Sequence, residues 1–216
     1  MQTLCQCDPS LSVIIPVYNL EKWITPMLDS LKAQQLGDYK VEYIFVINNC
    51  TDRSEEVIKG SGLDCKILHC DIQGCGEARN IGFEQAYGKY IWFMDGDDWL
   101  MTEDAIKQVL DKIIREDLDI LRVSWESDKF TFPYFSMVWQ YVFKKTFIDE
   151  FRFVNIQPCE DDEYMERVLK KAHWNRDTYF AIPVIYTPLY FYRYLREGSN
   201  MYRHHILGER NVLSKL

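Results

Sequence analysis

The chain has 216 residues, of which 47% are hydrophobic and 15% aromatic, a composition that excludes a disordered protein and allows a large buried core. Its formal net charge of -8 argues against nonspecific nucleic-acid binding, and no apolar run approaches the roughly 20 residues that span a bilayer. The N-terminus lacks the basic and apolar regions of a signal peptide. The 7 cysteines have no Cys-x-x-Cys spacing, which favours free thiols in a reducing compartment. We therefore expect a cytoplasmic protein without a nucleic-acid partner.

The first hundred residues alternate between strand and helix patterns. Buried strands are expected at 12–18, 41–47, 66–70 and 90–94, the first with a break or edge near Pro16. Helices are expected between them, one with Pro26 at its first residue or at a kink, one over 52–59, and one from about 74 to 87. This alternation predicts an α/β fold with a mostly parallel sheet, whose ligand crevice lies beyond the carboxyl ends of the strands.

The second half of the chain is patterned less regularly. A helix after Thr102 and a strand at 119–125 are expected, followed by an aromatic helix at 139–147 and another helix at 161–173. Residues 179–195 are β-like, and Pro183 and Pro188 are expected to break them into pieces. Because no shift in composition separates the halves, we predict a single domain.

The stretch from Tyr90 to Leu100 is the centre of the functional prediction. A buried apolar run ends in three carboxylates, those of Asp95, Asp97 and Asp98, with Gly96 expected to let the backbone turn sharply. Like charges this close cost stability unless something neutralises them, and hard oxygen ligands suit Mg²⁺ or Mn²⁺. The alternative is an acidic turn that caps the next helix.

Five motifs occur in order: Ser-Val-Ile-Ile-Pro-Val-Tyr-Asn (12–19), Asn-Cys-Thr-Asp (49–52), Ala-Arg-Asn-Ile-Gly (78–82), Phe-Met-Asp-Gly-Asp-Asp-Trp (93–99) and Glu-Asp-x-x-Tyr-x-x-Arg (160–167). Together they resemble the family 2 inverting glycosyltransferases, which have the GT-A fold. The resemblance implies a glycosyltransferase domain at 11–200, with a nucleotide-sugar-binding half (11–99) and an acceptor-binding half (100–200). Residues 1–10 would then be an N-terminal extension and 201–216 a C-terminal tail.

The resemblance also implies roles for residues that match the motifs. Asp95 and Asp97 would contact the ribose and hold the metal on the donor diphosphate, with Asp98 as a helper. Arg79 would lie near the diphosphate, where a guanidinium suits phosphate oxygens, unless it is a solvated helix residue. Lining of the base and ribose is implied for Pro16, Tyr18 and Asn19, for which turn formation and core packing are the alternative.

One segment departs from the family pattern. Related sequences usually carry two acids where this chain has Ile47 and Asn48, and one of those acids reads the uracil edge. An Asn amide can both accept and donate, so Asn48 could hold uracil or favour another base. The retained Asp52 is also explained by helix capping. Uridine diphosphate remains our first expectation for the donor nucleotide.

The general base of an inverting transfer must be a carboxylate away from the metal, and the resemblance assigns it to the pair Glu160 and Asp161, with Asp161 preferred. The alternative is that these acids only stabilise the N-terminus of the following helix. Arg193 or Arg196 could approach the diphosphate or acceptor, or be solvated.

The expected function is metal-dependent transfer of a hexose from a nucleotide sugar to a glycan or lipid-linked acceptor during polysaccharide or cell-surface glycan synthesis. With no transmembrane segment expected, the protein would be cytoplasmic, and association with the inner face of the membrane would be peripheral and need a partner. A non-catalytic nucleotide-binding relative is a second candidate, because the acids at 47 and 48 are missing. A sugar-nucleotide pyrophosphorylase is less favoured, since no glycine-rich loop follows the first strand.

Overall fold

The computed structural model describes residues 9–128, 137–154, 160–174, 178, 181–193 and 197. In the first half of the chain the predicted alternation of strands and helices is confirmed. Its elements are β1 (Leu11–Val17), α1 (Thr25–Lys32), β2 (Val41–Asn48), α2 (Ser54–Gly60), β3 (Lys66–Cys70), α3 (Cys75–Glu84) and β4 (Tyr90–Phe93). Pro26 lies in the first turn of α1, where its missing N–H has no intrahelical partner to lose.

The second half contains β5 (Trp99–Leu100), α4 (Ala105–Arg115), β6 (Ile120–Ser127), the 3-10 helix η1 (Val138–Gln140), β7 (Tyr141–Lys144), α5 (Lys145–Ile148), α6 (Glu160–Lys171) and β8 (Val184–Tyr192). The predicted helix at 139–147 is therefore wrong. Its centre is the strand β7, which pairs on both sides and is buried, and a short apolar run does not distinguish such a strand from a helix. Pro188 does not break β8 but coincides with a shift in its pairing to β6.

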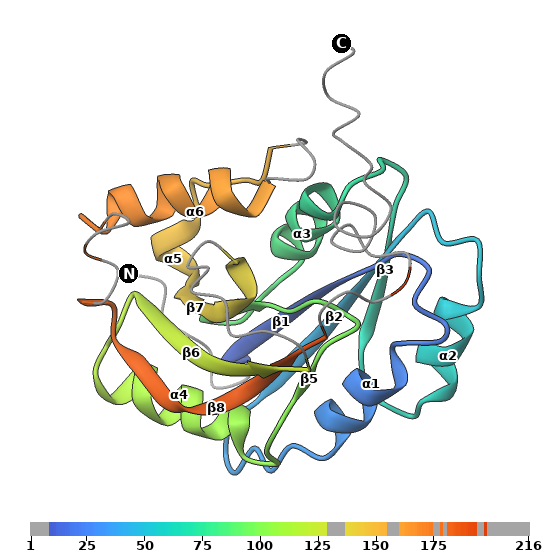
Figure 1. Ribbon diagram of the computed structural model, residues 1–216, viewed down its shortest axis with the longest axis horizontal. Coiled ribbons are helices and arrows are strands. Elements are labelled where there is room, and N and C mark those ends of the chain that lie inside the picture. Colours follow the sequence, from blue (N-terminus) through green and yellow to red (C-terminus); the bar gives the residue numbers. More distant parts are fainter. Residues whose placement is uncertain are drawn as a thin grey trace.

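These strands form one eight-stranded sheet in the order β3-β2-β1-β4-β7-β6-β8-β5. The first four neighbours are parallel, and β7 joins β4 antiparallel. Figure 1 shows α3, α5 and α6 covering one face of the sheet, while α1, α2 and α4 cover the other. Each layer has its own apolar core, which the alternating side chains of the buried strands supply. The sheet thus fixes the carboxyl ends of β1 to β4 at one edge.

Close approaches of the chain explain several residues around this edge. β1 continues through Pro16 without a break, but its pairing with β4 ends at Ile14, so at Pro16 the strand is paired only with β2 and has the expected local edge on its other side. Gly82 lets α3 pack directly on Ile14 of β1. The expected sharp turn is present, since the N–H of Asp98 donates to the carbonyl of Asp95 at 3.1 Å. Gly96 makes this turn without a positive φ. It is required because a Cβ there would lie 2.6 Å from Cδ1 of Leu20.

The predicted tail at 201–216 and most of the predicted extension at 1–10 lie outside the described residues, as does Arg196. The division of the domain into halves at 99/100 stays a prediction. Within the described ranges, no helix is long and apolar enough to cross a bilayer.

Candidate functional site

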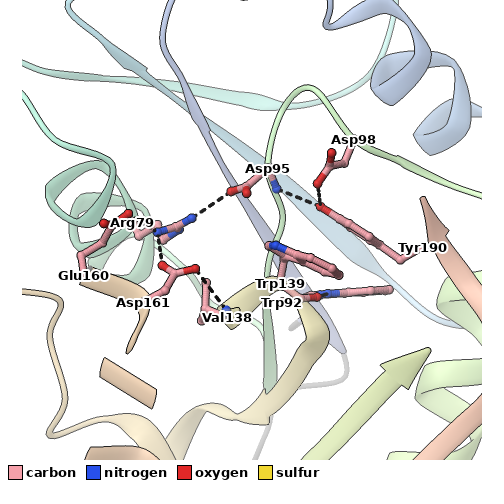
Figure 2. Close-up of polar contacts among 9 residues, drawn as sticks. All are labelled: Arg79, Trp92, Asp95, Asp98, Val138, Trp139, Glu160, Asp161 and Tyr190. Carbon is pink, nitrogen blue, oxygen red and sulfur yellow. Dashed lines mark hydrogen bonds and ion pairs between the residues drawn. The ribbon is translucent and has the colours of Figure 1, made fainter. Parts of the chain in front are cut away.

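A cluster of charged side chains lies at the carboxyl edge of the parallel strands, where α3 begins, β4 ends and α6 begins (Figure 2). At its centre is Arg79 on α3, whose side chain is only 2% exposed. The structure brings three predicted site residues from distant parts of the chain around this one guanidinium, namely Asp95, Glu160 and Asp161. We call these four residues the charged cluster.

Arg79 pairs with all three carboxylates. Its Nη2 donates to Oδ1 of Asp95 at 2.8 Å, and its Nη1 donates to Oδ1 of Asp161 at 2.7 Å and to Oε1 of Glu160 at 3.2 Å. Its buried Nε has no hydrogen-bond partner within the described part of the chain. Arg79 is therefore not a solvated helix residue. It links the acidic turn after β4 to the acids of α6, and its predicted contact with the diphosphate stays a prediction.

The pKa values in the cluster follow from three carboxyl groups that share one cation, the guanidinium of Arg79. Burial raises the pKa of Asp161 to about 6, with Arg79 opposing the rise and Glu160 adding to it. Burial also raises the pKa of Asp95 to about 6, again against the effect of Arg79. The pKa of Glu160 is raised for the same first reason. A carboxyl with a pKa near 6 can accept a proton at neutral pH more readily than an ordinary aspartate.

Asp161 is held in place from a second side. Its Oδ2 accepts a hydrogen bond from the backbone N–H of Val138 at 3.2 Å, at the start of η1 (Figure 2). It also lies in the first turn of α6, where the helix dipole favours acids. The two interpretations of Asp161 are thus compatible, because its carboxylate points toward Arg79 while its position suits the helix. The contact with Val138 has no signal in the sequence.

The acidic turn from Asp95 to Asp98 separates its carboxylates. Asp95 and Asp97 are partly exposed, whereas Asp98 is completely buried. Both oxygens of Asp98 accept hydrogen bonds, Oδ2 from the hydroxyl of Tyr190 at 2.6 Å and Oδ1 from the backbone N–H of Arg193 at 2.8 Å. Burial raises the pKa of Asp98 well above its usual range, with Asp97 and Asp95 adding to the rise. This geometry favours a supporting role for Asp98 over the predicted metal contact.

Beside the charged cluster, the loops after β1 and β2 are joined by amide groups. Oδ1 of Asn19 accepts from the backbone N–H of Thr51 at 2.8 Å. Nδ2 of Asn48 donates to the carbonyl of Ile72 at 2.6 Å, while its Oδ1 accepts from the N–H of Gly74 at 3.1 Å. We call Asn19 and Asn48 the amide pair. Both predicted base-reading amides are therefore engaged with neighbouring loops, and Asn48 is only 4% exposed.

The other predicted donor-site residues lie at the same edge. The ring of Tyr18 is exposed at the end of β1, while Pro16 is buried within the strand. Asp52 accepts from the N–H of Glu21 at 2.9 Å and from the N–H of Ser54 at 3.0 Å, so it joins the start of α2 to the loop after β1. Of these side chains, Tyr18 is the one presented to solvent for a ligand.

The acidic turn offers carboxylates to a divalent cation, but only a few. No group of three or more His, Cys, Asp or Glu residues that could hold a metal occurs in the described residues. Mg²⁺ is commonly held by one or two protein carboxylates together with substrate phosphates, a requirement that Asp97 and Asp95 can satisfy. The donor set therefore fits a metal that arrives with a diphosphate.

The fold matches that of known GT-A glycosyltransferases. The structure of Staphylococcus aureus TarS 1-349 in complex with UDP-GlcNAc superposes with a TM-score of 0.78 at 22% identity, covering 89% of this chain and 60% of that one. The mannosyltransferase PcManGT from Pyrobaculum calidifontis, in complex with GDP-Man and Mn²⁺, gives a TM-score of 0.63 at 16% identity, covering 84% and 55%. The predicted GT-A fold is thereby confirmed.

Residues 12–163 match the model of glycosyl transferase family 2, and the chain belongs to this family. It is 34% identical over 116 residues to glycosyltransferase GlyA of Streptococcus pneumoniae, covering 52% of this chain and 16% of GlyA. It is 26% identical over 209 residues to the poly(ribitol-phosphate) beta-N-acetylglucosaminyltransferase TarS of Staphylococcus aureus, covering 88% of this chain and 36% of TarS. The chain thus spans well under two thirds of the length of these two relatives.

Proposed function

We propose that this chain carries the catalytic site of a metal-dependent inverting glycosyltransferase, which moves a sugar from a nucleotide diphosphate to a hydroxyl of a glycan or lipid-linked acceptor. The observation that carries the proposal is the charged cluster, in which a carboxyl with a pKa of about 6, Asp161, lies across Arg79 from the acidic turn. An in-line displacement requires a base on one face of the anomeric carbon and a site for the leaving diphosphate on the other, and Asp161 and the acidic turn are the proposed pair.

In the proposed reaction Asp161 takes the proton of the acceptor hydroxyl. The acceptor oxygen forms a bond to the anomeric carbon while the bond from that carbon to the diphosphate oxygen breaks on the opposite face, which inverts the configuration. Asp97, with Asp95 beside it, would hold Mn²⁺ or Mg²⁺, which when bound offsets the charge on the leaving diphosphate. Arg79 keeps the two acid-bearing segments in register and supplies positive charge between them.

Uridine diphosphate is the proposed donor nucleotide. TarS, which shares the fold, has been solved with UDP-GlcNAc, and Tyr18 presents a ring for a base at the end of β1. The amide pair does not bear on this choice, because its hydrogen bonds go to loops. Polysaccharide or cell-surface glycan synthesis is the proposed setting, because the relative TarS is by name a poly(ribitol-phosphate) beta-N-acetylglucosaminyltransferase.

The metal site is tested by Asp97→Ala, with the exposed Asp38→Ala as a control of equal charge change. Titration calorimetry with UDP and Mn²⁺ should show that Asp97→Ala loses metal-dependent nucleotide binding, while Asp38→Ala retains it. Unchanged binding by Asp97→Ala would remove Asp97 from the metal site.

The activity is tested by screening nucleotide sugars for thermal stabilisation with and without Mn²⁺, followed by transfer assays on glycan and lipid-linked acceptors. Transfer with inversion supports the proposal. Binding of nucleotide and Mn²⁺ without turnover on any acceptor would favour the non-catalytic relative instead.

A further inference from the structure

The acidic turn is hydrogen-bonded to a side-chain hydroxyl of β8, that of Tyr190. The Tyr190 hydroxyl accepts a hydrogen bond from the backbone N–H of Asp95 at 3.1 Å and donates one to Oδ2 of Asp98 at 2.6 Å (Figure 2). The turn is also closed within itself, since the N–H of Asp98 donates to the carbonyl of Asp95 at 3.1 Å. One side chain therefore binds both ends of the four-residue segment that carries Asp97.

Stacked aromatic rings hold Tyr190 in a fixed position. Its completely buried ring stacks on Trp139, with centroids 4.7 Å apart and planes at 10°. Trp139 is in turn tied to β4, because Nε1 of Trp92 donates to the Trp139 carbonyl at 2.8 Å. Figure 2 shows the three rings packed beneath the acidic turn. A ring enclosed in this way cannot follow the turn if the turn moves, so its hydroxyl is a fixed point.

The backbone of β8 holds the same segment just beyond its last acid. Trp99 and Leu100 of β5 pair with Phe191 and Tyr190, and the Trp99 ring stacks on Phe191 at 4.1 Å. The N–H of Arg193 donates to Oδ1 of Asp98. Both the start and the end of the turn are thus attached to β8, about a hundred residues further along the chain.

We propose that Tyr190 is a positioning residue that fixes the acidic turn in its metal-binding geometry before the donor arrives; this inference rests on the proposed function. Carboxylates that are already held in the orientation that binds a cation lose less conformational freedom on binding, which strengthens the binding. Because β8 lies in the half of the chain predicted to bind the acceptor, Tyr190 is also one of the contacts through which that half sets affinity for the donor and its metal.

Tyr190→Phe tests the inference because it removes one oxygen and keeps the stacked ring. The N–H of Asp95 and an oxygen of buried Asp98 then lose a partner, so the turn should relax. We expect the affinity for UDP in the presence of Mn²⁺ to fall about tenfold to a hundredfold by calorimetry. UDP affinity without metal should not change, which separates positioning of the metal-binding acids from a general structural defect.

Tyr90→Phe is the matched control. Tyr90 is also completely buried in the sheet, but its hydroxyl has no hydrogen-bond partner among the described residues, so its loss should leave Mn²⁺-dependent binding unchanged. Asp98→Asn provides a second disruption of the same contact if Tyr190→Phe melts far below the wild type. In the double variant the two losses should add only in part, because the variants share the bond between Tyr190 and Asp98, while each also affects a second bond, to the N–H of Asp95 or of Arg193.

The outcomes are distinguishable. If the wild type binds UDP with Mn²⁺ and Tyr190→Phe binds it equally well, the inference is wrong and the proposed function stands. If the wild type shows no metal-dependent binding of any nucleotide sugar, the proposed function and the inference are both wrong. A selective loss in Tyr190→Phe, absent in Tyr90→Phe, supports the inference.

Discussion

The charged cluster and the amide pair lie at the same edge of the sheet but are built by different means. In the charged cluster, a buried Arg79 joins three carboxylates from the turn after β4 and the start of α6, of which Asp95 is the most exposed, at 28%. In the amide pair, neutral side chains bind backbone groups of neighbouring loops, as Asn48 does with the loop after β3. Burial of like charges shifts the pKa values of the acids, whereas hydrogen bonds from side-chain amides to backbone groups fix the shape of the loops. The first region is therefore suited to proton transfer and charge stabilisation, and the second to shaping the place where a nucleotide would lie.

The largest effect is expected from Asp161→Asn, which removes the proposed base from the charged cluster. The value of kcat should fall by about 10²–10⁴-fold, since that is the usual contribution of a general base, while donor affinity stays near that of the wild type. Asp162→Asn is the control, because Asp162 is an exposed neighbour in the same first turn of α6. Equal losses in the two variants, measured by transfer assays, would show that these acids serve only the helix.

The same prediction has a pH dependence. Asp161 must be ionised to accept a proton, so with a pKa of about 6 the value of kcat/KM should fall about tenfold per pH unit below pH 6. This acid limb should be absent from the residual activity of Asp161→Asn. The pH dependence of the stability has the opposite sign. Because the folded-state pKa of Asp161 lies above the ordinary value of 3.8, its contribution to the free energy of unfolding is present at low pH and is lost as the pH rises through 6.

A smaller but still large effect is expected from Arg79→Met, which leaves three partly or fully buried acids without their shared cation. Loss of one partner from a buried ionic group costs about 3–5 kcal/mol in the free energy of unfolding. Arg53→Met is the control, because Arg53 pairs with Glu21 at the surface with 78% of its side chain exposed, where a pair contributes about 1 kcal/mol or less. Urea denaturation at pH 7.5, a value chosen to keep the acids ionised, compares the two. Similar losses would mean that the charged cluster is not energetically distinct from the surface.

The sequence predicts the residues of the charged cluster better than their contacts. Motifs identify Arg79, Asp95 and Asp161, but nothing in the spacing predicts that a single guanidinium joins them, because residues 79 and 161 meet only through tertiary packing. Tyr190 was missed for the same reason. Its segment, 189–193, contains Arg193, a candidate contact to the diphosphate or acceptor, but the hydroxyl of Tyr190 makes the contact with the acidic turn.

The fold was predictable where the hydrophobic pattern has one explanation. The strands of the first half are continuous apolar runs between turn residues, and they were placed within a few positions. The aromatic run at 139–147 suits either a buried strand or a helix, and pairing with β4 and β6 decides for the strand. Asn48 is predicted to hold a base because of its position in the family motif, and that role stays a prediction. The sequence alone does not show that its amide group is also bonded to the loop after β3.

The smallest effect is expected in the amide pair, from Asn48→Asp, and it tests whether that region shapes the site or reads the nucleotide directly. A carboxylate cannot donate to the carbonyl of Ile72, which lies 2.6 Å from Nδ2, and would repel it, so the loop after β3 should open. We expect a loss of about 1–3 kcal/mol in the free energy of unfolding, together with weaker binding of UDP. Asn49→Asp is the control. Asn49 is an exposed neighbour that also donates to a backbone carbonyl, that of Asp71, and water can replace this bond, so the free energy of unfolding should change by no more than about 0.5 kcal/mol.

If Asn48 reads the base, Asn48→Asp would instead tighten UDP binding by restoring the acid that related sequences carry. Calorimetry with UDP alongside thermal melting separates the two, because an opened loop lowers both affinity and stability, whereas a restored base contact raises affinity.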